Sequence, residues 1–206
     1  MSESEQHPRV PEADIDPMFT DRWSPRGFDP EPLTEVQIRQ LFEAARWAPS
    51  CFNEQPWRFH YATRTADREA YLSALVPRNR LWAERAPLLI FVVARRSFHQ
   101  SGRDNRHAPF DAGAAWLSLA LQARKMGLYA HAMAGFNQRR AYAVLGISEA
   151  DHHIMAAVAV GRKGSADHLP EEMQAIEAPN ARLPLEEIMV EGAAVTDAET
   201  EPDVLR

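Results

Sequence analysis

Two arginines on either side of a serine are the first residues in this sequence whose spacing suggests a binding chemistry. Arg22, Ser24 and Arg26 are two residues apart, and Pro25 favours an extended backbone at Ser24. Because alternate residues of an extended chain share a side, the three side chains point the same way. Two guanidinium groups beside a hydroxyl suit a phosphate ester and its sugar-like chain. The alternative is a solvated surface on which the arginines pair with neighbouring aspartates.

A second polar group lies on the loop between Pro49 and Pro56. Asn53 and Gln55 carry amides, which both donate and accept hydrogen bonds, and such groups on a loop between two rigid elements often bind ligands. Cys51 is the only cysteine of the chain and has no histidine near it in the sequence, so we interpret it as a small polar side chain. The alternative is a structural turn without a ligand.

Three other features carry weaker signals. The eight histidines show no metal-ligating pattern. Residues 161–164 follow an apolar run but lack the spacing of a phosphate-binding loop, so we predict a turn. Residues 95–107 are basic and form either a solvated loop or the electropositive rim of a substrate site. Their arginines are Arg95, Arg96, Arg103 and Arg106.

Apolar periodicity predicts the elements that must position these groups. Thr34 and Gln37 form a capping box at the start of the first helix. One predicted strand is apolar throughout, which indicates burial on both faces. Helices and strands do not alternate one for one, which favours an α+β layered fold over a doubly wound sheet. The predicted helices are 34–48, 111–126 and 138–145, and the predicted strands are 57–62, 87–94 and 153–160.

Length and composition limit the class of protein. The 206 residues, 45% hydrophobic and 25% charged, are typical of one folded domain, which we place at residues 17–192 between flexible tails at 1–16 and 193–206. The net charge of −6 argues against a general binder of nucleic acid or anionic membranes. The longest apolar run is too short to span a bilayer. A single cysteine and a polar N-terminus lead us to expect a cytoplasmic protein.

Five blocks, in order along the chain, resemble the nitroreductase family of small FMN-dependent reductases. The first is Arg-x-Ser-x-Arg at 22–26, and the second joins Ala-x-x-Ala-Pro-Ser at 45–50 to Asn-x-Gln-Pro-Trp at 53–57. The resemblance implies a three-layer fold with a mostly antiparallel sheet flanked by helices. It also implies a homodimer whose two flavin sites are shared between subunits. The remaining blocks lie at 111–128, 158–161 and 182–188.

The resemblance further implies which residues bind FMN. Arg22 and Arg182 would hold the phosphate, and Arg26 would lie toward the pyrimidine edge of the flavin. The turn at Ala134 and Gly135 would present a backbone N–H to flavin N5. The other implied contacts are Ser24 and Asn79 within the subunit, and Pro49, Ser50, Cys51 and Asn53 on the flavin of the partner subunit.

Three positions depart from the family pattern. Ala134 stands where many members have a glutamate, Trp82 where a lysine is common near the flavin, and Asn180 where a second basic residue is common near the phosphate. These departures remove charge from the surroundings of the cofactor. They bear on its redox tuning and on the range of substrates.

The activity implied by the resemblance is ping-pong electron transfer. NAD(P)H would reduce FMN, and a small electron-poor acceptor such as a nitroaromatic, quinone or enone would reoxidise it. No side chain needs to act as a nucleophile, because the cofactor does the chemistry. Other flavin chemistry on the same scaffold, such as flavin degradation or reductive dehalogenation, and flavin binding without turnover remain alternatives, because a fold and a cofactor do not determine the substrate.

Overall fold

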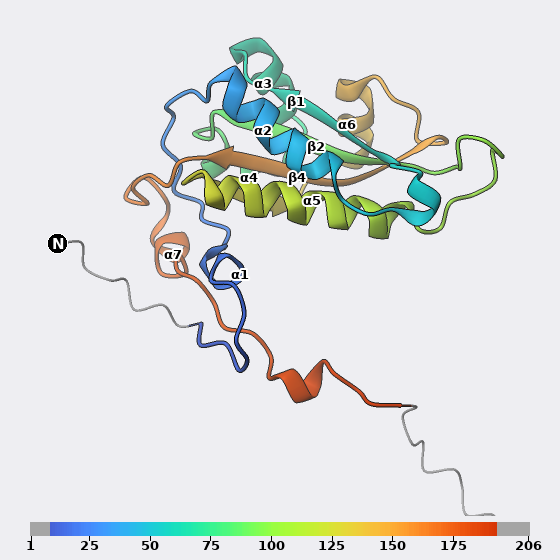
Figure 1. Ribbon diagram of the computed structural model, residues 1–206. Coiled ribbons are helices and arrows are strands. Elements are labelled where there is room, and N and C mark those ends of the chain that lie inside the picture. The colour runs from blue at the N-terminus through green and yellow to red at the C-terminus, as the bar shows by residue number, and fades with distance from the viewer. Residues whose placement is uncertain (1–8, 193–206) are drawn as a thin grey trace, which may run out of the picture.

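An antiparallel sheet forms the middle layer of the computed structural model, which describes residues 9–192 (Figure 1). The strand order is β1-β2-β4-β3, and each neighbouring pair is antiparallel. Residues 1–8 and 193–206, which make up most of the predicted tails, lie outside the described residues. The strands are β1 (Trp57–Ala62), β2 (Leu88–Arg95), β3 (Tyr129–Met133) and β4 (His152–Gly161).

β2 is buried on both faces, as its sequence predicts. Leu88 and Ile90 belong to one core cluster, whereas Leu89 and Phe91 belong to the cluster on the opposite face. Side chains alternate across a strand, so an entirely apolar strand can supply both cores. The sheet is therefore covered by helices on each side, which confirms the three-layer α+β prediction.

The helices α2 (Glu35–Arg46) and α5 (Ala108–Lys125) cover one face and pack against each other. The predicted capping box is present, since Thr34 Oγ1 accepts from the Gln37 amide N–H and the Gln37 side chain accepts from the Thr34 N–H. The start predicted for α5, at Asp111, is wrong. The helix begins at Ala108 because Pro109 falls in the first turn, where a missing N–H breaks no helical hydrogen bond.

Three shorter helices cover the other face: α3 (Thr65–Leu72), α4 (Pro77–Ala83) and α6 (Gln138–Leu145). The bounds of α6 agree with the prediction, whereas the sequence analysis does not predict α3 and α4. Trp82 of α4 is 1% exposed, and its ring stacks on Phe28 at 6.2 Å. Among residues 9–192 no helix is long and apolar enough to cross a membrane.

The two ends of the described chain run beside each other, past one end of the sheet (Figure 1). Phe28 forms a β-bridge with Lys163, and the Arg9 side chain donates to the backbone oxygen of Asn180. The segment after α7 then extends away from the sheet. The short elements are α1 (Met18–Asp21) and α7 (Glu171–Gln174) in these end segments, η1 (Cys51–Asn53) between α2 and β1, and η2 (Leu185–Glu187) near the C-terminus.

Candidate functional site

A cavity of about 660 Å³ lies between the segment that precedes α2 and the segment that follows α7. The sequence predicts four of the residues that line it as cofactor contacts: Arg22, Ser24, Arg26 and Arg182. They come from opposite ends of the chain, so the association of the two end segments builds the site. Arg9 and His131, which the sequence analysis does not single out, also line the cavity.

Arg9 is held in this cavity by hydrogen bonds to both end segments. Its Nε donates to the Asn180 backbone oxygen at 2.8 Å, and its Nη2 donates to Asn180 Oδ1 at 3.2 Å. Its Nη1 donates to the Thr20 oxygen at 3.0 Å and to the Arg22 oxygen. Arg182 Nη1 lies 3.4 Å from the same Asn180 Oδ1, so this amide connects two arginines.

The three guanidinium groups of Arg9, Arg22 and Arg182 repel one another. Burial, and then the charge of Arg182, lower the pKa of Arg22 below its usual value. The pKa of Arg9 is lowered by burial and then by Arg182 and Arg22. None of the three forms an ion pair with a carboxylate in the part of the chain that the structure describes. Like charges gathered around a cavity without a counter-ion are typical of an anion site.

Arg26 differs from these three because it has an acidic partner. Its Nη1 lies 3.7 Å from Glu177 Oε2, and the Glu177 side chain is only 6% exposed. Glu177 Oε1 also accepts from the backbone N–H groups of Arg26 at 2.6 Å and Gly27 at 2.7 Å. The carboxylate therefore shapes the 22–27 segment and offsets part of the charge that the sequence assigns to Arg26.

His131 of β3 is a neutral hydrogen-bonding group in the wall of the cavity. Burial lowers its pKa to about 4, with a further lowering by Arg26, although a hydrogen bond to Pro25 opposes the shift. Its Nδ1 lies 2.8 Å from the Pro25 carbonyl oxygen, so the neutral ring carries its proton on Nδ1 and keeps a lone pair on Nε2. Trp82 fixes the ring, with centroids 4.4 Å apart. Trp82 is thus a core residue that positions His131.

The structure brings Asn79 and the turn at Ala134 and Gly135 together. Asn79 Nδ2 donates to the Gly135 oxygen at 3.0 Å. A Cβ at Gly135 would lie 2.5 Å from Asn79 Nδ2, which explains the glycine. Ala134 is exposed. Asn79 lies one helical turn from Trp82, whose ring packs on His131, but this second group does not itself line the arginine cavity.

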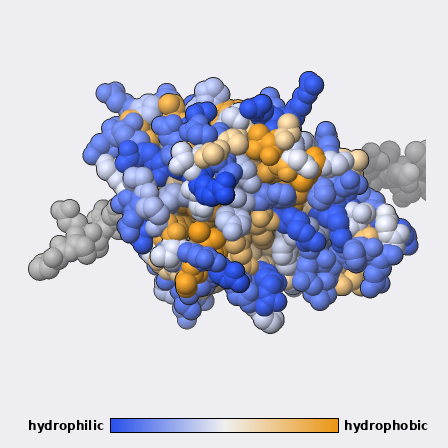
Figure 2. Space-filling model, turned by 90° about the horizontal axis from the view of Figure 1, so that it is seen from above, coloured by the Kyte–Doolittle hydropathy of each residue, from blue (hydrophilic) through white to orange (hydrophobic). Residues whose placement is uncertain are grey.

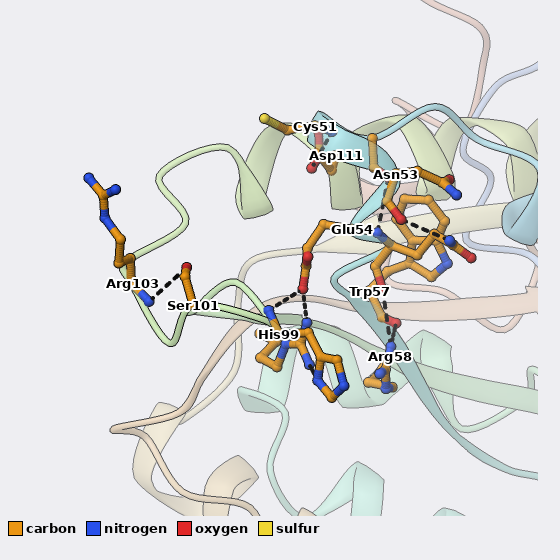
Figure 3. Close-up of polar contacts among 12 residues, drawn as sticks. Cys51, Asn53, Glu54, Trp57, Arg58, His99, Ser101, Arg103 and Asp111 are labelled. Carbon is orange, nitrogen blue, oxygen red and sulfur yellow. Dashed lines mark hydrogen bonds and ion pairs between the residues drawn. The ribbon is translucent and has the colours of Figure 1, made fainter.

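The loop after α2 is held in a strained conformation. Phe52, Asn53 and Gln55 have φ angles of 51°, 55° and 49°, which L-residues with side chains rarely adopt. The Cys51 N–H donates to Oδ2 of the buried Asp111 at 3.2 Å, and Glu54 accepts from the His99 N–H at 2.6 Å (Figure 3). Strain of this kind persists where surrounding contacts enforce it, which is common at functional sites.

This loop and the arginine cavity lie at opposite ends of α5. Asp111, in the first turn, holds the loop at Cys51, whereas Arg124, in the last turn, covers the ring of Tyr129. Tyr129 in turn packs against Trp23 of the arginine segment, with centroids 6.0 Å apart. An α-helix rises about 20 Å between positions 111 and 124. Within one chain the structure therefore does not bring Pro49, Ser50, Cys51 and Asn53 to Arg22 and Arg182.

The basic loop 95–107 divides into structural and exposed arginines. Arg95 forms an ion pair with Glu54, and Arg96 Nε donates to the His152 oxygen at 3.2 Å. Arg103 and Arg106 instead line a cavity of about 480 Å³ together with Phe52. The interpretation of all four arginines as one rim is therefore wrong for Arg95 and Arg96. Across residues 9–192, no three His, Cys, Asp or Glu side chains group as a metal site.

Comparison with known proteins connects these residues to a family. The sequence model of the Nitroreductase family matches residues 19–79 and 75–162. A Streptomyces coelicolor protein named NADH dehydrogenase/NAD(P)H nitroreductase is 26% identical over 171 residues, or 72% of this chain and 85% of its own length. A second protein with that description, from the same organism, is 31% identical over 100 residues, covering 48% of this chain and half (50%) of its own. A solved structure of an oxidoreductase containing FMN has a TM-score of 0.86 and 37% identity, and the match covers 94% of this chain and 98% of that one.

Proposed function

We propose a function from the premise that this chain belongs to the nitroreductase family: it is an oxidoreductase that binds FMN and passes electrons from NAD(P)H to a small acceptor. The family match covers most of the folded part of the chain. The similar solved structure contains FMN, and the similar Streptomyces proteins are named as NAD(P)H nitroreductases. The assignment to particular residues rests on the geometry of the arginine cavity.

The observation that carries the proposal is the group of arginines without a counter-ion. The phosphate of FMN bears about −1.5 to −2 charges near neutral pH, and it needs at least two cations. Arg22 and Arg182 supply them from the two end segments. The Arg22 guanidinium makes no hydrogen bond to another side chain or backbone group among residues 9–192, so its donors are available to phosphate oxygens.

The rest of the site then orients the flavin. Bound FMN supplies the hydride and electron transfer, so the chain contributes position and charge. Arg26 at the pyrimidine edge favours the negative charge that reduction brings, and Glu177 moderates that effect. His131 Nε2 would be available to accept a hydrogen bond from bound FMN. The turn at Ala134 and Gly135 would present a backbone N–H to the flavin, and Asn79 holds that turn in place.

The loop after α2 serves the flavin of a second subunit in a homodimer. The separation along α5 leaves the loop without a role at the arginine cavity of its own chain. α2 and β1 also expose apolar side chains, among them Trp47 at 73%, Val36 at 66% and Tyr61 at 52%. These residues border an open groove. Seen from above, orange apolar side chains lie in several places among the hydrophilic ones on the surface of the molecule (Figure 2). A second copy of the chain would cover them.

Donor and acceptor share one cavity above the flavin and react in turn. The acceptors are electron-poor compounds such as nitroaromatics, quinones or enones. The exposed Ala134 leaves the N5 side open and uncharged, which admits acceptors of different size. Because both substrates use one place, the first product must leave before the second substrate enters.

The test is spectroscopic and kinetic. Purified protein should be yellow and hold about one FMN per chain, and anaerobic NADH or NADPH should bleach it. Double-reciprocal plots with a nitroaromatic should give parallel lines. Release of FAD, or no flavin binding after reconstitution with FMN, would contradict the assignment of the cofactor. Flavin that stays yellow with both nucleotides would indicate binding without turnover, and intersecting lines would indicate separate pockets.

A further inference from the structure

Arg9 lies outside residues 19–162, the part of the chain that the family pattern matches, yet it is built into the arginine cavity. A guanidinium has five N–H groups. Four of them donate to Thr20, Arg22 and Asn180, with one bond to each of the first two and two to the third. One N–H on Nη2 remains. The side chain therefore fastens both end segments together and still presents its charge to the cavity.

The Arg9 guanidinium lies where, in the absence of a bound anion, its positive charge lowers the stability of the folded protein. Arg9 is placed beside Arg22 and Arg182, and its pKa is lowered by burial and then by repulsion from these two groups. No carboxylate among the described residues forms an ion pair with it. A dianion in the cavity would turn this repulsion into attraction for all three groups.

The segment that carries Arg9 is also packed against the C-terminal segment. Residues 10–20 and 181–188 line a common cavity of about 430 Å³. Phe19 and Ile188 are among its apolar residues, and the Leu185 N–H donates to Glu12 Oε2 at 3.2 Å. The segment thus crosses the phosphate side of the site as a strap, by which we mean residues 9–20.

We propose that Arg9 is a third cationic group of the FMN phosphate site, and that it fastens the strap over the bound phosphate. This inference rests on the proposed function, since it takes FMN as the ligand. It predicts that the contribution of Arg9 is specific to the phosphate. Riboflavin, which lacks the phosphate, should not gain from Arg9.

The experiment compares FMN and riboflavin binding to apo-protein by quenching of flavin fluorescence. Arg9→Ala should weaken FMN binding about tenfold or more, as expected for the loss of a charge-assisted contact, and leave riboflavin binding within about twofold. Arg9→Lys keeps the positive charge but loses the paired N–H donors of the guanidinium, so its FMN affinity should lie between those of the wild type and Arg9→Ala. Asn180→Arg in the Arg9→Ala background should recover part of the preference for FMN, because position 180 lies between Arg9 and Arg182. Arg64→Ala, which removes an exposed arginine paired with Asp67 at the start of α3, is the matched control.

A second readout follows the strap itself. FMN should protect the bond after Arg9 from trypsin in the wild-type protein, and riboflavin should protect it less. Equal loss of FMN and riboflavin binding in Arg9→Ala, or no loss of either, would overturn the inference. Equal protection by the two flavins would also overturn it. A wild-type protein that does not prefer FMN to riboflavin would instead contradict the proposed function.

Discussion

Arg22 and Arg182 face each other without a counter-ion, and this arrangement gives their removal two opposite effects. Arg22→Ala or Arg182→Ala should raise the Kd of FMN at least tenfold, because a charge-assisted hydrogen bond contributes about 1.5–3 kcal/mol. The free energy of unfolding of the apo-protein should fall little or rise, because the substitution relieves repulsion. Flavin fluorescence and denaturant unfolding measure the two quantities. Unchanged FMN affinity in both variants would remove the phosphate assignment.

His131 should make stability depend on pH in a defined window. Its pKa is about 4 in the folded protein and near 6.5 when unfolded, so only the unfolded state takes up a proton as the pH falls from 6.5 to 4. The free energy of unfolding should therefore decrease by up to about 3 kcal/mol over this range and level off below it. Above pH 6.5 the contribution is fully present.

The measurement is urea unfolding at several pH values between 4 and 7. His131→Gln cannot titrate and should flatten the pH dependence, whereas His168→Gln, at an exposed position, should leave it as in the wild type. An identical slope in wild type and His131→Gln would show that His131 does not stay neutral in the fold.

The sequence predicts the residues of the arginine site that follow a local pattern. Arg22, Ser24 and Arg26 share a side of an extended chain, so spacing alone groups them. Arg9 and Glu177 act across the chain, and no local spacing indicates their partners: Arg9 binds Asn180 over 171 positions, and Glu177 binds Arg26 over 151. His131 becomes an acceptor only because Pro25 and Trp82 fix its ring.

Among the structural elements, the loop 95–107 is expected to influence whether the protein prefers NADPH or NADH as its electron donor. Arg103 and Arg106 line the cavity beside Phe52, whose ring packs edge-on against Phe98 at 6.2 Å. An aromatic pair next to two cations suits an adenosine that carries a phosphate, which is the feature that separates NADPH from NADH. Arg103→Ala with Arg106→Ala should therefore lower kcat/KM for NADPH about tenfold and change kcat/KM for NADH much less.

A matched variant separates this effect from disorder of the loop. Arg95→Ala removes the ion pair with Glu54 and should affect both donors alike, because it loosens the strained segment around Phe52. If the double variant keeps the wild-type ratio of the two kcat/KM values, Arg103 and Arg106 are solvated surface groups.

The sequence predicts the elements whose apolar residues form a clear local pattern. These are α2, α6, β1, β2 and β4, together with α5 except for its start. β3 is not predicted, because its five residues, Tyr129–Met133, do not alternate clearly, and pairing with β4 specifies them as a strand. β3 also positions His131 and the turn that follows it. Because β3 is not predicted, the sequence does not indicate that His131 lines the cavity.

At the scale of the whole molecule, a shared flavin site requires one subunit to supply the loop after α2 and its partner to supply the arginine cavity. α5 separates the loop after α2 from the arginine cavity by about 20 Å. A two-fold arrangement would bring the loop of one subunit to the arginines of the other. Hybrid dimers with defects in different parts can test this claim.

One subunit would carry Arg22→Ala with Arg182→Ala and an intact loop. The other would keep both arginines and carry Asn53→Gly, which removes the amide while glycine still permits the φ of 55°. In a shared-site hybrid, one of the two sites receives intact arginines from one subunit and an intact loop from its partner. The other site collects all the defects.

Purified hybrids, isolated with two different affinity tags, should thus oxidise NAD(P)H at about half the wild-type rate per dimer and exceed both parental homodimers. The hybrid should also retain one FMN where the arginine variant retains none, because only one of its two cavities keeps its guanidinium groups. If each site were instead complete within one chain, every site of the hybrid would carry one defect, and its rate would equal the mean of the parents. That mean would contradict the shared site, while the arginine cavity could still bind FMN within a single subunit.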